Sequence, residues 1–303
     1  MLLVIIMKFL KFLVVVLTIF ACLVFSYGYL MEKEVISTLI NYYDRTPSVL
    51  INNEYQKEID ESFVHITDDF IADDRNELLN IYYTVMASGM NEFTFFCGTK
   101  YDKCIEDVLD INNDDDLMSQ INNFVHVYNS FKSIKTTYTT NGKINLYVNR
   151  VYSEDDINKI NEELDRIENK IIDKSKNDRD NILSIHDYII NNTKYNVEDE
   201  NKPNTVSSTA IGVLFKKLAT CNGYTDAASL LMDRLNIKNI RISNDEHIWN
   251  LVYLDGKWLH LDLTWDDPVN KADKDMLLHD YFLKETKDMD EKHNYDKNIF
   301  NFI

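Results

Sequence analysis

Apolar residues recur at helical spacing in several segments of this 303-residue chain. Ile157, Ile160, Leu164 and Ile167 form one apolar stripe that follows the capping signature beginning at Ser153, which predicts a helix to about residue 174. The remaining patterns predict further helices over residues 74–90, 114–131, 181–190, 206–218 and 221–235. Much of the chain is therefore expected to be helical.

Short alternating segments between these helices predict strands. Residues 93–97 (FTFFC) form one, and residues 134–149 form a hairpin in which Asn141-Gly142 supplies two positive-φ turn residues. Three more strands are expected at 237–243, 247–253 and 258–263. Because helices come first and antiparallel strands follow, the C-terminal half is expected to be α+β and not doubly wound.

The first 30 residues differ from the rest of the chain. Residues 12–30 carry no charge and follow Lys8 and Lys11, so they are long enough to cross a bilayer as a helix. The two lysines place the N-terminus in the cytoplasm and everything after Met31 outside the cell membrane. A single-pass, uncleaved signal anchor is favoured over a cleaved signal peptide and over a lipid-modified Cys22.

Changes in amino-acid composition along the chain predict three domains. Residues 1–30 are the anchor, and residues 31–175 comprise a polar stalk with one short helix and a smaller α+β domain, whose role no motif indicates. The polar run at 175–180 then separates this part from a domain at 176–303.

Charge and cysteine usage narrow the functional classes. The formal net charge is −18, so nucleic acid would be repelled, and a neutral or cationic substrate suits the chain better. Cys97 and Cys104 flank a short loop and are expected to form a disulfide in an exported domain. Cys221 would then remain an unpaired thiol.

Cys221 stands at the start of the predicted helix over 221–235, with Thr220 as its N-cap. Free backbone N–H groups and the helix dipole favour a thiolate at such a position. The cysteine is therefore a candidate nucleophile, although a buried apolar thiol is the commoner role for a free cysteine.

The turn at Asp255-Gly256 fixes the register of the second hairpin. If Leu254 pairs with Lys257, then His247 and Asp262 lie on one face of the sheet, within reach of a hydrogen bond. His260 and Asp266 are rival partners, but His260 projects parallel to the Asp262 carboxylate and Asp266 lies in a predicted turn. A cysteine, a histidine and an aspartate together provide nucleophile, base and base-orienting group.

Three ordered motifs resemble those of the transglutaminase-like superfamily, whose core is related to papain-type cysteine proteases. They are C-x-G-Y from Cys221, H-x-W-N from His247 and D-x-T-W-x-D-P from Asp262. The resemblance extends over about residues 184–282 and departs from the family pattern at Thr220 and Thr225. It implies a helix that begins at the cysteine and packs against an antiparallel sheet that carries the histidine and the aspartate.

The resemblance also implies roles for these residues. Cys221 would be the nucleophile, His247 the base and Asp262 the residue that orients the imidazole, while Tyr195 is a candidate for the oxyanion donor beside the Cys221 backbone N–H. The expected activity is acyl transfer from protein or peptide amides through a thioester, as a transglutaminase, deamidase or protease, on exported or cell-wall substrates.

The alternative is a catalytically inactive binding or scaffold module of the same fold. The sequence has no phosphate loop, HExxH helix or paired CxxC motif, so no cofactor and no metal are expected.

Overall fold

A computed structural model describes residues 2–57, 59–200, 202, 204–268, 276–289 and 291–303, and these residues fall into two units. The first unit, Met1–Thr46, holds helix α1 (Leu2–Tyr43). The sequence predicted a membrane segment followed by a stalk with a separate short helix, but one helix continues without interruption to Tyr43. No proline or glycine interrupts the segment after Gly28, and the first breaker is Pro47.

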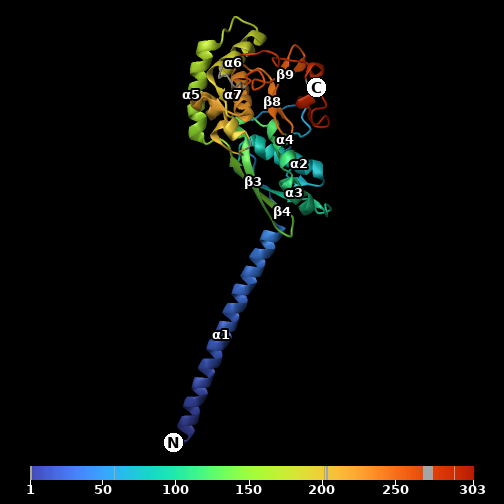
Figure 1. Ribbon diagram of the computed structural model, residues 1–303. Coiled ribbons are helices and arrows are strands. Elements are labelled where there is room, and N and C mark those ends of the chain that lie inside the picture. Colours follow the sequence, from blue (N-terminus) through green and yellow to red (C-terminus); the bar gives the residue numbers. More distant parts are fainter. Residues whose placement is uncertain (1, 58, 201, 203, 269–275, 290) are drawn as a thin grey trace. The chain divides into compact units, whose positions relative to one another are not determined.

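The second unit, Pro47–Ile303, contains all other elements (Figure 1). Its first sheet has the strand order β1-β2-β4-β3, in which β1 is parallel to β2 and the other pairs are antiparallel. The strands of this sheet are β1 (Ile71–Ala72), β2 (Glu92–Cys97), β3 (Phe131–Tyr138) and β4 (Lys143–Arg150). The helices of this region are α2 (Arg75–Ser88), α3 (Cys104–Asn113), α4 (Asp115–Asn123) and the 3₁₀ turn η1 (Val127–Asn129).

The helix expected over residues 114–131 ends at Asn123, so that prediction is wrong at its C-terminal end. The buried side chain of Asn129 donates hydrogen bonds to the backbone carbonyls of Ala87 (2.7 Å) and Tyr55 (3.3 Å). These tertiary contacts hold residues 127–129 in a 3₁₀ turn, and the chain enters β3 directly afterwards.

The hairpin of β3 and β4 is confirmed, but its turn is not the expected two-residue type. Gly142 has φ +82°, whereas Asn141 does not share this left-handed conformation. Thr139 N–H donates to the Lys143 carbonyl, and Gly142 N–H donates to the Thr139 carbonyl. Residues 140–142 therefore form a three-residue loop that ends in a left-handed glycine.

The expected disulfide between Cys97 and Cys104 is confirmed, with Cα atoms 5.9 Å apart. It joins the end of β2 to the first residue of α3. Cys22 and Cys221 are free thiols among the described residues.

Replacing Cys97 and Cys104 together by alanine should lower the free energy of unfolding by about 2–3 kcal/mol, because the crosslink restricts a short loop in the unfolded chain. Urea denaturation followed by circular dichroism measures this difference. A Cys22→Ser variant, which leaves the disulfide intact, is the control. If the double variant and the control unfold at the same urea concentration, the prediction is contradicted.

Three helices and a second sheet make up the rest of the unit. The helices are α5 (Glu154–Ile171), α6 (Asp178–Asn192) and α7 (Cys221–Arg234), and the sheet has β8 (Ile248–Leu254) between β7 (Asn239–Ser243) and β9 (Lys257–Leu261). Contacts run from α5 to α6, from α6 to α7 and from α7 to β8 (Figure 1). This arrangement confirms the α+β class, while the division at residue 175 stays a prediction.

Short elements complete the connections. They are the parallel pair β5 (Lys194–Tyr195) and β6 (Leu218–Ala219), the 3₁₀ turns η2 (Val197–Asp199), η3 (Val206–Ser208), η5 (Thr286–Asp288) and η6 (Glu291–His293), and the π-helical turn η4 (Gly212–Lys216). The α-helix expected over 206–218 is therefore wrong. A Cβ at Gly212 would lie 2.8 Å from the Ser207 Cα and 2.9 Å from the Leu218 carbonyl oxygen, which shows how tightly this segment folds back on itself.

Both faces of the second sheet are buried. Val252, Leu259 and Leu261 pack in the cluster that includes α6 and α7, while Trp249 and Leu251 pack in the cluster around α2 and the first sheet. The candidate site therefore lies at one end of a strand pair that is buried on both sides, where His247 precedes β8 and Asp262 follows β9.

Candidate functional site

Cys221 is the first residue of α7, as predicted, and its side chain is half-buried. Thr220 occupies the N-cap position, but its hydroxyl makes no cap hydrogen bond and donates instead to the Ser207 carbonyl at 3.4 Å. A Cβ at Gly223 would lie 2.6 Å from that same carbonyl oxygen. Only glycine allows the first turn of α7 to approach residue 207 this closely, which explains the glycine of the C-x-G-Y motif.

The tyrosine of that motif connects α7 to the segment after β9. Tyr224 is buried, and its hydroxyl donates to the Asp267 carboxylate at 2.6 Å. Burial and the charge of Asp267 raise the pKa of Tyr224, so its phenol stays protonated and remains a donor. The cysteine helix is therefore fixed to the D-x-T-W-x-D-P motif through this contact.

His247 and Asp262 lie at the open ends of β8 and β9. The ladder pairs Leu254 with Lys257 and Asn250 with Leu261, which confirms the predicted register, and the Asp255-Gly256 turn has φ +53° and +81°. His247 Nε2 lies 2.6 Å from the Asp262 Oδ2 atom. The structure therefore brings these two predicted residues into direct contact.

The Asp262 carboxylate is almost fully buried and satisfied on both oxygens. Its Oδ1 atom accepts hydrogen bonds from Thr264 N–H (2.9 Å), the Thr264 hydroxyl (2.6 Å) and Trp265 N–H (3.2 Å), which accounts for the D-x-T-W pattern. Burial alone would raise the pKa of the Asp262 carboxyl. The charge and hydrogen bond of His247, with further donors, hold this pKa well below its usual range, so the group is ionised.

Cys221 is the third member of this group. Burial alone would lower the pKa of His247, but the charge and hydrogen bond of Asp262, together with the nearby Cys221 side chain, raise it to about 10. Because Nε2 contacts Asp262, Nδ1 is the ring nitrogen that remains for another partner. The structure therefore places His247 against Asp262 and near Cys221, while the catalytic roles of the three residues stay a prediction.

The rest of the H-x-W-N motif holds this arrangement in place. The Trp249 ring stacks on the His247 ring at 5.6 Å between centroids. The Asn250 side chain donates to the Thr225 carbonyl (3.2 Å) and to the Ser229 hydroxyl (2.8 Å), both on α7. β8 is therefore held against the cysteine helix by buried hydrogen bonds.

The rival partners have other contacts. His260 Nδ1 accepts a hydrogen bond from the Trp249 indole at 2.9 Å, and its Nε2 contacts the Thr286 hydroxyl. Burial and the proximity of His293 lower the pKa of His260 to about 4, so its imidazole is neutral. Asp266 contacts His186, not His247.

Tyr195, the candidate oxyanion donor, lies on β5 and lines the same groove as His247. Burial and the charges of Cys221 and Glu200 raise the pKa of Tyr195, so the phenol keeps its proton. Its hydroxyl donates to the Glu200 Oε1 atom at 3.2 Å. The role of Tyr195 therefore stays a prediction, and it would require the hydroxyl to exchange this partner for a substrate.

The sequence analysis did not identify His293, which is buried and has its Nε2 atom 2.8 Å from Asp262 Oδ2. It lies on η6, and its ring packs edge-to-face on Trp265. No periodicity or motif marks this histidine, because it lies in an irregular segment 31 residues beyond its carboxylate partner. Asp262 is therefore oriented by two histidines and not by His247 alone.

Removing the His293 ring should destabilise the fold. A His293→Ala variant removes one of the two partners of Asp262 Oδ2, and a hydrogen bond to a charged group contributes about 1.5–3 kcal/mol. Urea denaturation at neutral pH measures the loss. His293→Gln retains an N–H donor and should recover part of it, while His65→Ala removes an exposed histidine and serves as the control. If His293→Ala and His65→Ala have the same free energy of unfolding, the contact between His293 and Asp262 contributes nothing to stability.

Comparison with known proteins gives one family match. Residues 165–263 match the model of the transglutaminase-like superfamily, a region that includes Cys221, His247 and Asp262 but not His293. No curated protein matches the sequence.

Two solved structures resemble this chain at 15% identity. One is a TGase, for which the match covers 55% of this chain and 50% of that chain with a TM-score of 0.35. The other is a cysteine protease candidate from Cytophaga hutchinsonii, with 44% and 61% coverage and a TM-score of 0.29. The chain thus spans between half and two thirds of the length of these proteins.

Proposed function

We propose that the chain, whose residues 165–263 match the model of the transglutaminase-like superfamily, is a thiol-dependent enzyme that transfers acyl groups from protein or peptide amides. The observation that supports this best is the contact of His247 Nε2 with the Asp262 carboxylate at 2.6 Å, with Cys221 near the same imidazole at the start of α7. A nucleophile, a base and a base-orienting group in contact are the minimum set for this chemistry.

The chemistry would proceed in two steps. The Cys221 sulfur attacks the amide carbonyl carbon, a C–S bond forms, and the C–N bond breaks as the imidazolium of His247 gives its proton to the leaving nitrogen. The product is a thioester and free ammonia or amine. An incoming amine or water then loses a proton to His247 and attacks the thioester, which releases the acyl product and regenerates the thiol. Throughout, Asp262 would hold the imidazole in orientation.

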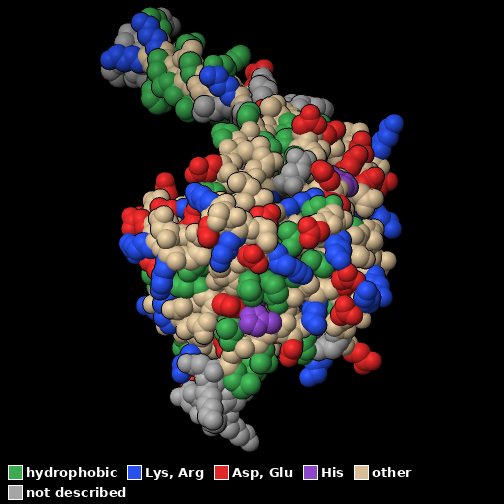
Figure 2. All heavy atoms as spheres, turned by 90° about the horizontal axis from the view of Figure 1, so that it is seen from above, with side chains coloured by type: hydrophobic (Ala, Val, Ile, Leu, Met, Phe, Trp, Pro, Cys, Tyr) green, Lys and Arg blue, Asp and Glu red, His purple; other side chains and the backbone are tan. Residues whose placement is uncertain are grey.

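The groove beside His247 supports a cationic substrate. Its volume is about 1090 Å³, and Tyr195, Thr264 and Trp265 also line it. Twenty residues line this groove, and they include one lysine, Lys292, and eight acids: Asp114, Asp116, Glu200, Asp245, Glu246, Asp267, Glu291 and Asp296. The chain as a whole is less one-sided, since it has 50 acidic and 32 basic residues. On the face shown in Figure 2, blue Lys and Arg side chains lie among red Asp and Glu side chains. The excess of acids in the groove favours a lysine side chain or a basic peptide as a reactant.

The experiment that tests the function offers the full chain in detergent a glutamine peptide, with and without a primary amine. Mass spectrometry separates the three reactions. Amine incorporation indicates a transglutaminase, deamidation indicates a hydrolase, and chain cleavage indicates a protease. If none of these products forms from glutamine peptides or basic protein substrates, the chain is instead a binding module of the same fold.

We propose that α1 anchors this domain at the outer surface of the cell membrane. Met7–Lys33 is long and apolar enough to cross a membrane, with a mean hydropathy of 2.6, and a signal sequence near the N-terminus would have the same properties. Lys8 and Lys11 at its start support a cytoplasmic N-terminus.

This topology predicts that protease added to intact cells digests the domain, while the membrane fraction holds the full-length chain. A cytoplasmic protein in the same cells is the control for lysis. A shortened chain recovered only from the medium would contradict the anchor.

A further inference from the structure

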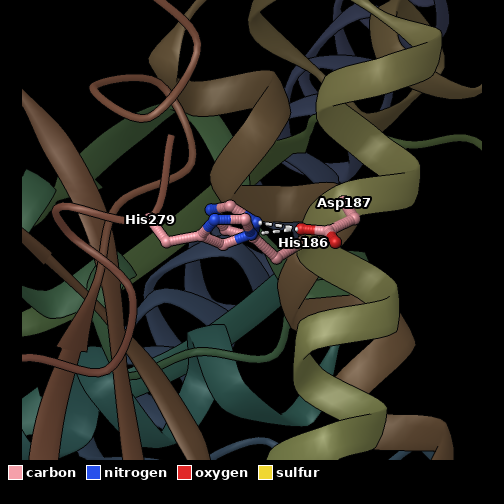
Figure 3. Close-up of side chains that lie close together, drawn as sticks. All are labelled: His186, Asp187 and His279. Carbon is pink, nitrogen blue, oxygen red and sulfur yellow. Dashed lines mark hydrogen bonds and ion pairs between the residues drawn. The ribbon is translucent and has the colours of Figure 1, made fainter. Parts of the chain in front are cut away.

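A second group of titratable side chains lies outside the candidate catalytic site. His186 and Asp187 are adjacent residues on α6, and His279 comes from the segment that follows β9. Figure 3 shows the two imidazole rings and the carboxylate turned toward one another. His186 Nδ1 and His279 Nε2 lie 2.9 Å and 2.8 Å from the same oxygen, Asp187 Oδ1.

The other nitrogen of His186 contacts a second carboxylate. Nε2 lies 3.1 Å from Asp266 Oδ2, and both residues are fully buried. The Asp266 carboxylate also accepts the Tyr281 N–H. The buried His186 ring therefore has a carboxylate at each of its two nitrogens.

These contacts bring two imidazole nitrogens, one from α6 and one from the segment after β9, to a single carboxylate oxygen. Imidazole nitrogens and carboxylate oxygens are ligands that Zn²⁺ takes in proteins. A metal ion bound among them would hold all three side chains at once.

We propose that His186 Nδ1, Asp187 Oδ1 and His279 Nε2 bind a divalent transition-metal ion, for which Zn²⁺ is the representative. The three atoms all lie within 4.8 Å of one another. In tetrahedral zinc sites the ligand atoms lie about 2.0–2.2 Å from the ion and a little over about 3 Å from one another. The two nitrogens here lie 2.9 Å and 2.8 Å from the carboxylate oxygen, so a small outward shift of two side chains would admit the ion. Asp187 and His279 are 35% and 45% exposed, which permits that shift and leaves a fourth position for water.

Zinc sites commonly contain a carboxylate–imidazole contact like the one between Asp266 and His186. A buried carboxylate accepts the N–H of a ligating imidazole and thereby fixes the ring orientation. Two imidazole nitrogens also favour Zn²⁺ over Ca²⁺ or Mg²⁺, which prefer oxygen ligands. No sequence motif marks this group, because 92 residues separate Asp187 from His279.

An ion bound here would connect α6 to the segment around Tyr281, whose backbone contacts Asp262, the candidate catalytic aspartate. Tyr281, two residues beyond His279, donates its N–H to Asp266 and accepts the Asp262 N–H on its carbonyl at 3.2 Å. Zinc is therefore expected to stabilise the fold around Asp262. This role does not depend on whether the chain catalyses acyl transfer.

The test is a calorimetric titration of the full chain in detergent with Zn²⁺ after treatment with a chelator. A chain that carries both Cys22→Ser and Cys221→Ser is used as the background, so that neither free thiol can bind the metal. We expect one site whose affinity falls at least about tenfold in His279→Ala and in Asp187→Asn. His65→Ala, which removes an exposed histidine elsewhere, should bind as the background does.

Thermal unfolding gives a second readout. Zn²⁺ should raise the melting temperature of the background variant and of His65→Ala, but not that of His279→Ala, because an ion that binds the folded state shifts the unfolding equilibrium. The proposal is overturned if the background binds no Zn²⁺ even at millimolar concentration. It is equally overturned if His279→Ala and Asp187→Asn bind Zn²⁺ as tightly as the background, since the ion would then lie at another site.

Discussion

Replacing Cys221 with alanine is expected to reduce turnover of any amide substrate by at least about 10⁴-fold. The variant keeps the contact between His247 and Asp262, but no sulfur remains to form the thioester. Since Cys221 is half-buried at a helix start, a smaller side chain should be accommodated without loss of the fold. Turnover is measured with the substrate that the mass-spectrometric assay identifies.

The control for this variant is Cys22→Ser, which changes the other free thiol among the described residues. It should retain full turnover, and both variants should unfold at the same urea concentration as the parent chain. Substantial turnover by Cys221→Ala would show that the nucleophile is another group, and Cys221 would then be a packing residue.

Local sequence signals predicted the elements that carry the candidate site. The apolar spacing after Cys221 located the start of α7, and Asp255-Gly256 fixed the register that aligns His247 with Asp262. These signals succeed because helix periodicity and a two-residue turn depend on neighbours in the sequence.

The errors arose where tertiary contacts determine the backbone. Residues 206–218 have helical spacing, yet the close approach of Gly212 to residues 207 and 218 divides them into short turns and a strand. Similarly, the Asn129 side chain donates hydrogen bonds to the distant backbone carbonyls of Tyr55 and Ala87, and the helix that begins at Asp115 ends at Asn123.

His293 could not be predicted for a related reason. It reaches Asp262 from an irregular segment, and packing against Trp265 and Tyr281 determines where its ring lies. A single histidine in such a segment carries no spacing that a sequence pattern can detect. The sequence therefore identified the residues of the site that belong to motifs and missed the partner that does not.

Alkylation of Cys221 by iodoacetamide near pH 6 is expected to slow roughly 100-fold when His247 is replaced with alanine. A free cysteine thiol ionises near pH 8.5, so well under about one per cent would be thiolate at that pH. In the parent chain the pKa of His247 is raised to about 10, which means that the imidazolium persists until the pH rises through that value. If this positive ring lies beside the Cys221 sulfur, as the proposed mechanism requires, it favours the thiolate over the thiol.

The pH profile distinguishes this coupling from a loss of access to the sulfur. The parent chain should be alkylated at a nearly constant rate from pH 6 to 9, whereas the rate for His247→Ala should rise by about tenfold per pH unit until the free thiol ionises. A change in access alone would lower the rate equally at every pH. His65→Ala should reproduce the flat profile of the parent. Parallel profiles for the parent and His247→Ala would mean that the imidazole does not stabilise the thiolate, and the proposed nucleophile would lose its activating group.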